Sequence, residues 1–287
     1  MAGGDDGVQA GSVPRSTPDD DVELTFVGTA TVLLRHGGFT LLTDPNFLHA
    51  GERAYLGLGL SSKRLTNPGM EIDELPPLDF VVLSHHHGDH FDRVAVERLD
   101  KDLPIVTEPH GARKLRQQGF RNPVALETWQ SHRIVRGGNE VTITAMPGKH
   151  APQPLGALLP PVMGSLLEFR RQGELSLRLY VSGDTLLHDR LAEIPRRHPD
   201  IDVCLLHLGG TRVAGILLTM DAVQGVRALQ ILQPAVAVPI HFNDYPVFKS
   251  SLDDFRHAAE QAQLDAEIRY VSHGETITVT PRRAARR

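Results

Sequence analysis

Residues 79–90 read Asp-Phe-Val-Val-Leu-Ser-His-His-His-Gly-Asp-His, and the fold and the chemistry that we expect both start from this stretch. Its first part, 79–83, is a short apolar run of the kind that forms a buried β-strand. Histidine and carboxylate side chains follow at once, so they should lie in the loop at the carboxyl end of that strand. Because catalytic residues collect in loops that a rigid sheet supports, the stretch predicts a functional loop.

The spacing of the polar residues in this loop suits metal ions. His85 and His87 are two residues apart, so in an extended loop they project to the same side and can share one ion. Asp89 and His90 come next and can reach a second ion. Imidazole and carboxylate ligands together suit Zn(II), Mn(II) or Fe(II). We therefore expect two divalent metal ions, with zinc favoured, and we expect His86 to point away from them.

Three further predicted strands are each followed by a residue that can bind metal, namely His150, Asp184 and His241. Strand ends at one edge of a sheet can meet in space although they are distant in sequence. His150 could complete the ligands of the first ion and His241 those of the second, and the Asp184 carboxylate could bridge the two. Two ions roughly 3.5–4 Å apart can hold a hydroxide between them.

The apolar runs and turn residues predict one α/β domain. We expect strands at 24–27, 31–35, 39–43, 79–83, 105–106, 141–145, 165–169, 175–181, 203–206 and 236–240, and two more near the end. We expect helices at 93–99, 111–118, 221–232 and 252–263. Residues 1–21 are expected to be a disordered segment, 22–280 a single domain and 281–287 a basic tail.

Composition limits the classes of function. The 287 residues are 40% hydrophobic and 23% charged, which is typical of a globular protein, and the net charge of −5 gives no general attraction to nucleic acid. The single cysteine, Cys204, excludes a disulfide framework and fits a reducing cytoplasm. Residues 1–20 lack the pattern of a signal peptide, and no apolar run approaches a membrane span. We therefore expect a cytoplasmic protein without a membrane span or a nucleic-acid partner.

Two loops, 45–77 and 151–163, should shape a pocket for a small-molecule substrate. Their apolar side chains could equally form a homo-oligomer surface or a membrane-facing patch. Lys149 lies beside His150 and could contact an anionic substrate, and His207 follows a predicted strand and is a candidate to line the site. The apolar loop residues concerned are Leu56, Leu58, Leu60, Leu155, Leu158, Leu159, Pro160 and Pro161.

The order of these motifs resembles the metallo-β-lactamase superfamily over about residues 23–280. The motifs are His-x-His-x-Asp-His at 85–90, His150, Ser-Gly-Asp-Thr at 182–185 and Pro-Ile-His at 239–241. The resemblance implies an αββα four-layer sandwich, with a dinuclear site at one edge of its two sheets. It also implies one ion on His85, His87 and His150, a second on Asp89, His90 and His241, and Asp184 as the bridge.

The start of the domain resembles two branches of this superfamily, the one typified by L-ascorbate-6-phosphate lactonase and that of N-acylphosphatidylethanolamine-hydrolysing phospholipase D. The residues concerned are Gly-x-Ala-Thr-Val-Leu at 28–33 and Leu-Thr-Asp-Pro at 42–45. Many relatives have histidine where Thr29 stands, so a role of that histidine does not carry over. Asp44 should either orient a ligand histidine or be a turn residue before proline.

These features predict a metal-dependent hydrolase in which a hydroxide bridged by two metal ions attacks the substrate. Asp89, as a ligand beside the hydroxide, is the candidate to orient it and to handle its proton. A phosphodiester or cyclic phosphate is the first choice of substrate, and a lactone or other ester is the alternative. Common zinc β-lactamases have cysteine where Asp184 stands, which argues against β-lactams. An iron-dependent redox enzyme and an inactive metal-binding protein stay open as alternatives of other classes.

Overall fold

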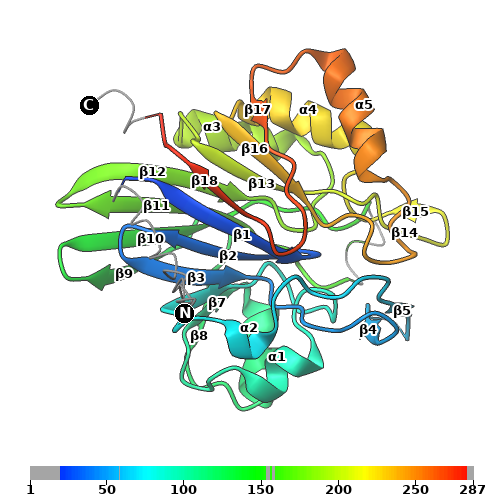
Figure 1. Ribbon diagram of the computed structural model, residues 1–287, viewed down its shortest axis with the longest axis horizontal. Helices are drawn as coiled ribbons and strands as arrows, with labels where there is room; N and C mark the ends of the chain where they lie inside the picture. Colours follow the sequence, from blue (N-terminus) through cyan, green and yellow to red (C-terminus); the bar gives the residue numbers. More distant parts are fainter. Residues whose placement is uncertain (1–19, 58, 153–155, 157–158, 283–287) are drawn as a thin grey trace, which may run out of the picture.

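The computed structural model describes residues 20–57, 59–152, 156 and 159–282. Two seven-stranded sheets pack face to face, and helices cover the outer face of each sheet (Figure 1). Helices α1 (Arg93–Arg98) and α2 (Pro109–Gln117) cover one sheet. Helices α3 (Glu193–Arg197), α4 (Ala222–Leu232) and α5 (Leu252–Ala262) cover the other. The expected αββα sandwich is confirmed.

The first sheet has the strand order β18-β1-β2-β3-β6-β7-β8. The pairs from β18 to β3 are antiparallel, whereas β3, β6, β7 and β8 run parallel. The parallel part therefore brings the carboxyl ends of β3 and β6 to the same edge of the sheet. The strands are β1 (Val22–Gly28), β2 (Thr31–His36), β3 (Phe39–Thr43), β6 (Phe80–Val82), β7 (Ile105–Thr107), β8 (Pro123–Ala125) and β18 (Thr276–Val279).

The second sheet has the order β17-β16-β13-β12-β11-β10-β9. Strands β9 to β12 form an antiparallel meander, and β12, β13, β16 and β17 run parallel. The carboxyl ends of β12, β13 and β16 therefore also share one edge. The strands are β9 (Ser131–Arg136), β10 (Asn139–Met146), β11 (Gly164–Arg171), β12 (Glu174–Val181), β13 (Val203–His207), β16 (Val236–Ile240) and β17 (Glu267–Ile268).

The core has three layers because strand side chains alternate between the two faces of a sheet. On β13, Val203 and Leu205 belong to the core between the sheets, whereas Cys204 and Leu206 pack under the helices. Burial on both faces explains why this strand is a continuous apolar run in the sequence. Each buried leucine or valine contributes roughly 1.5–3 kcal/mol. The core thus fixes the strand ends that carry the site.

The structure adds elements that the sequence did not predict. The loop 45–77 contains a hairpin of β4 (Arg53–Tyr55) and β5 (Ser61–Lys63), followed by the 3-10 turn η1 (Ile72–Glu74). A second small hairpin pairs β14 (Arg212–Val213) with β15 (Ile216–Leu217), and the 3-10 turn η3 (Asp189–Ala192) precedes α3. Strands β8 and β9 were also missed, because they are short or mostly exposed and lack an apolar run.

The expected terminal segments, 1–21 and 281–287, lie almost wholly outside the described residues. The boundaries of the single domain at 22–280 therefore stay a prediction. Among the described residues, no helix combines the length and the apolar character that a membrane crossing needs.

A half-buried ion pair between β11 and β12 gives a stability prediction. Arg178 Nη2 donates to Glu168 Oε1 over 2.6 Å, and His198 Nδ1 lies 3.6 Å from Glu168 Oε2. His198 and then Arg178 hold the pKa of Glu168 at about 2, against the desolvation that raises it. Because this pKa is depressed on folding, the stabilisation is present above pH 4.5 and is lost as the pH falls towards 2.

We expect Glu168→Gln to lower the free energy of unfolding by about 1–3 kcal/mol at pH 7. The free energies of unfolding of the variant and the parent should converge as the pH falls from 4.5 towards 2, because Glu168 of the unfolded parent is protonated in this range while that of the folded parent is still ionised. Glu260→Gln, at an exposed position on α5, is the control and should differ little from the parent at either pH. If the difference in the free energy of unfolding between Glu168→Gln and the parent is as large at pH 3 as at pH 7, this account is wrong.

Candidate metal centre

The seven side chains that the sequence singled out as metal ligands lie together at one edge of the sandwich, and all of them are buried. Four come from the loop after β6 in the first sheet, and three follow β10, β12 and β16 in the second. They form two groups in which the possible ligand atoms lie within 4.8 Å of one another. One group is His85, His87 and His150, and the other is Asp89, His90, Asp184 and His241.

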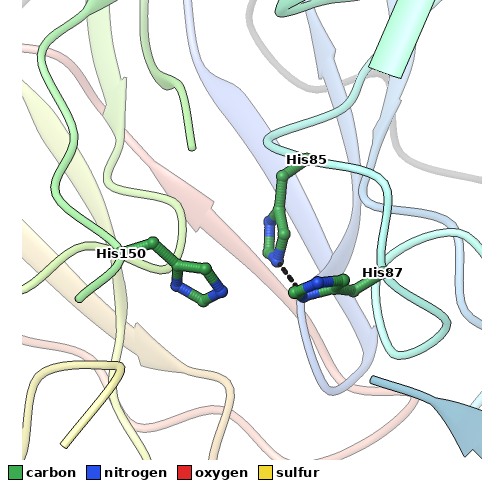
Figure 2. Close-up of side chains that lie close together, drawn as sticks. All are labelled: His85, His87 and His150. Carbon is green, nitrogen blue, oxygen red and sulfur yellow. Dashed lines mark hydrogen bonds between the residues drawn. The ribbon is translucent and has the colours of Figure 1, made fainter. Parts of the chain in front are cut away.

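The first group consists of three imidazoles that face a common space (Figure 2). His85 Nε2 and His87 Nδ1 lie 2.9 Å apart, and the His150 ring centre is 5.0 Å from that of His85. His150 Nδ1 can donate to the Asp184 carbonyl oxygen over 3.1 Å, which leaves Nε2 with a free lone pair. Burial, followed by repulsion from His90, holds the pKa of His85 well below its usual value, so this ring is neutral. A neutral imidazole is the form that binds metal.

The second group surrounds the Asp184 carboxylate. His90 Nε2 lies 3.3 Å from Asp184 Oδ2, and His241 Nε2 lies 3.5 Å from Asp184 Oδ1. His241 Nε2 also lies 3.7 Å from Asp89 Oδ2. Burial opposes ionisation of Asp184, but His241 and His90 outweigh it and hold the pKa of Asp184 far below its usual value. The carboxylate thus belongs to the second group, and its expected bridging contact with the first stays a prediction.

Unpartnered atoms show that the residues present fit metal ions. Buried polar atoms normally have hydrogen-bond partners, because leaving one without a partner costs free energy. Here several buried nitrogen and oxygen atoms lack one and lie next to each other. They are His90 Nε2, His150 Nε2, His241 Nε2, Asp89 Oδ1 and Asp184 Oδ1. Imidazole nitrogens and carboxylate oxygens in one place suit Zn(II), Mn(II) or Fe(II).

In several of these imidazole rings, the nitrogen that does not face the metal group contacts a polar group of the protein. His241 Nδ1 can donate to the Leu208 carbonyl oxygen over 3.1 Å, and His85 Nδ1 lies 3.0 Å from Ser84 Oγ. Such contacts fix the tautomer and the ring orientation of a metal-binding histidine. His86, in contrast, turns out of the loop and pairs with Gln118 at 2.9 Å, in the direction that we expected.

Asp44 and His207 lie behind His90. Asp44 Oδ1 accepts from the Ser84 backbone amide over 2.7 Å, and Oδ2 lies 3.4 Å from His90 Nδ1 and 3.3 Å from His207 Nε2. Burial raises the pKa of Asp44, but His90 and His207 outweigh it and bring that pKa to about 2. These contacts support the orienting role that was one of the two predicted for Asp44. His207 is fully buried and stacks on His90, with ring centres 5.8 Å apart.

Lys149 contributes to the site through its backbone. Its amide donates to Thr185 Oγ1 over 2.9 Å, and its carbonyl accepts from the Leu186 amide over 2.7 Å. These bonds tie the end of β10 to the end of β12 and so place His150 beside Asp184. The Lys149 side chain is exposed, and its expected contact with an anionic substrate stays a prediction.

The two loops that should shape a pocket do border a cavity beside the centre. Its lining includes Leu48 and Ala54 from the first loop and Leu159 and Pro160 from the second. Leu60 is 40% exposed. Of the apolar residues named in the sequence, Leu58, Leu155 and Leu158 lie outside the described residues.

The sequence did not predict a role for Asp244, and its neighbour Thr29 was noted only as a departure from related sequences. Asp244 is fully buried, and its Oδ2 accepts from the Thr29 amide over 2.6 Å. The Thr29 carbonyl oxygen accepts from the His241 amide over 2.6 Å. Thr29 and His241 both have positive φ, at 51° and 62°, which non-glycine residues rarely adopt. The only sequence signal is that a carboxylate stands three residues after a ligand histidine.

A family model described as "Beta-lactamase superfamily domain" matches residues 40–242. The chain belongs to the metallo-β-lactamase superfamily. Its motif order, its αββα sandwich and the position of its histidine cluster agree with this membership. The first relative described next is named a metal-dependent hydrolase, and the other two are named for the compounds that they hydrolyse.

A UPF0173 metal-dependent hydrolase from Opitutus terrae is 31% identical over 275 residues, which is 90% of this chain and 100% of that protein. An N-acyl-phosphatidylethanolamine-hydrolyzing phospholipase D from Caenorhabditis elegans is 35% identical over 137 residues, 45% of this chain and 38% of that protein. The isothiocyanate hydrolase from Delia radicum gut bacteria shares the fold, with a TM-score of 0.75, 23% identity and coverage of 90% of this chain and 99% of that one. The protein is accordingly a metal-dependent hydrolase.

The two groups predict how metal content depends on single residues. Purified protein should hold two divalent ions, and His150→Ala and His241→Ala should each lose about one, because each removes a ligand from a different group. Plasma mass spectrometry after dialysis measures the ions per chain. His257→Ala, on the exposed face of α5, is the matched control and should keep both. Full metal content in both site variants would refute the assignment.

The Asp244 contacts predict a selective effect on the second group. Asp244→Asn removes the negative charge that holds Thr29 and, through it, the His241 backbone. We expect metal affinity at the second group to fall by roughly 10–100-fold, as for other outer contacts of metal ligands. Competition with a chelating dye measures the two affinities separately, and Asp265→Asn at an exposed position is the control. Equal weakening of both affinities would indicate general loosening of the fold instead.

Proposed function

We propose that the protein is a two-metal phosphodiesterase that hydrolyses a phosphodiester or a cyclic phosphate. The observation that carries this proposal is the set of unpartnered nitrogen and oxygen atoms that converge from both sheets, described above. The likeness to a phospholipase D from Caenorhabditis elegans supports phosphorus as the centre attacked, because a phospholipase D hydrolyses a phosphodiester bond.

Two divalent ions in this site would lower the pKa of bound water from 15.7 towards about 7 and offset the charge that develops on the attacked group. The chain's own contribution is to place acceptors beside the attacking water. Asp89 Oδ1 is buried and unpartnered. His90 and His241 hold the pKa of Asp89 below its usual value although burial raises it. Asp89 is therefore ionised at neutral pH and can accept a proton at Oδ1.

No covalent nucleophile is needed for this chemistry, and the cysteine does not supply one. Cys204 is fully buried on β13, and burial raises the pKa of its thiol far above neutral pH. Its sulfur therefore belongs to the core under the helices. A cytoplasmic location and a homo-oligomeric state stay predictions.

Hydrolysis of bis(p-nitrophenyl) phosphate tests the proposal, with a γ-lactone and a thioester as comparison substrates. We expect metal-dependent turnover of the phosphodiester. We also expect His87→Ala to lower kcat by on the order of 10²-fold, because it removes a ligand of the first group. His257→Ala should behave as the parent. Turnover of the lactone alone would shift the assignment to carbon centres, and bound metal without turnover of any substrate would contradict it. Bound iron with oxygen consumption would indicate redox chemistry instead.

A further inference from the structure

A cavity of about 610 Å³ lies beside the metal centre, and the mechanism above does not use it. Helix α1, helix α2 and the strand β4 each contribute to its lining, as do Leu159 and Pro160. Cavities of this size hold small organic ligands. The cavity reaches the metal centre at one residue, because His87 is both a wall of the cavity and a member of the first group.

His87 presents one ring nitrogen to each side. Its Nδ1 faces His85 Nε2 inside the metal group (Figure 2). Its Nε2 is buried and without a hydrogen-bond partner. It is this atom that a Cβ on Gly57, another lining residue, would approach to 3.2 Å. With Nδ1 in the metal group, Nε2 carries the hydrogen and lies under Gly57.

The walls near His87 are apolar. Leu48, Phe91 and Val96 face the cavity together with Leu159 and Pro160. Two of the polar side chains in the lining already have partners in the protein. Asp92 accepts from the backbone amides of Phe47, Leu48 and Ala95, and His86 pairs with Gln118. A ligand body in this space must therefore be apolar, since it finds few free polar groups to replace water.

The lining also contains cationic side chains. Lys114 and Arg53 line the cavity, and among the described residues neither has a carboxylate within 4.0 Å of its charged group. Arg93 also lines it, but Glu52 and Glu97 pair with that guanidinium. Lys114 lies close enough to His86 and His110 to help lower the pKa of both, after burial as the main cause. An anionic group on a ligand would find an unmatched positive charge here.

We propose that this cavity binds the apolar arm of the substrate, and that the arm carries an anionic group that reaches Lys114. The substrate class is thus an amphiphilic anion whose hydrolysable group lies on the metal side of His87. This inference rests on the proposed hydrolytic function of the adjacent centre. It assigns to the substrate a second polar group, which Lys114 binds, in addition to the bond that is cut.

Binding of alkanesulfonates to the metal-loaded protein tests the proposal by calorimetry, because these anions are not hydrolysed. From hexanesulfonate to octanesulfonate the Kd should fall by about fourfold per added methylene group. Val96→Trp fills the cavity and should raise the Kd at least tenfold, whereas Val223→Trp, at an exposed position on α4, should not. Lys114→Gln should raise the Kd of octanesulfonate by about threefold to fivefold and leave that of octan-1-ol unchanged. Arg113→Gln, the preceding cation on α2, is its control.

The outcomes separate this proposal from the proposed function. Octanesulfonate should also inhibit hydrolysis of bis(p-nitrophenyl) phosphate competitively. The cavity proposal alone is overturned if neither Val96→Trp nor Lys114→Gln changes the Kd of octanesulfonate. It is also overturned if octanesulfonate binds to an active enzyme without inhibiting it. Binding that is weakened by these variants, in a protein that hydrolyses none of the substrates, supports the cavity as a ligand site and overturns the proposed phosphodiesterase function. No saturable binding of any sulfonate overturns the cavity proposal.

Discussion

The Asp184 carboxylate, buried between His90 and His241, is the contact on which the rest of the site depends. Asp184 follows β12 in the second sheet, whereas His90 follows β6 in the first. Their 3.3 Å approach therefore exists only when the two sheets are packed on each other at this edge. A buried carboxylate between two imidazoles is stable only if their charges are matched. The hydrophobic layers thus hold buried carboxylate and imidazole groups close together. A bound metal cation would offset the free energy that this burial costs.

Backbone strain collects around this contact. Thr29, Asp44 and His241 all have positive φ although none of them is glycine. Such conformations cost roughly 1–3 kcal/mol each and persist only where the surrounding structure enforces them. Hydrogen bonds supply that enforcement here. Asp244 holds the Thr29 amide, and Thr29 in turn holds the His241 amide. The strain accompanies the sharp turns that bring His241 and the residues supporting the metal ligands into one small space.

The sequence predicted the parts of the structure whose cause is local. Strand β13 was recognisable because burial on both faces makes it an almost wholly apolar run, and the candidate metal ligands were recognisable because each follows a predicted strand. Strand β9 was not predicted, because it is largely exposed and most of its residues are polar. The role of Asp244 was not predicted for a different reason. Its partner Thr29 is 215 residues away, so its role exists only after the chain has folded back on itself.

The cavity beside His87 could not be predicted from the sequence either, because its walls come from distant parts of the chain. The apolar character of the loops was visible in the sequence, but three possible roles stayed open for them. The structure places Leu159 and Pro160 on the same cavity as Phe91 and Lys114, which are distant in sequence. That juxtaposition of apolar walls with an unmatched cation favours a small amphiphilic ligand at this surface.

Anomalous diffraction from crystals of the metal-loaded protein, recorded on both sides of the metal absorption edge, tests the central claim most directly. The account predicts two peaks about 3.5–4 Å apart. One should lie among His85, His87 and His150, and the other should contact Asp89, His90, Asp184 and His241. A single peak, or two peaks away from these side chains, would contradict it.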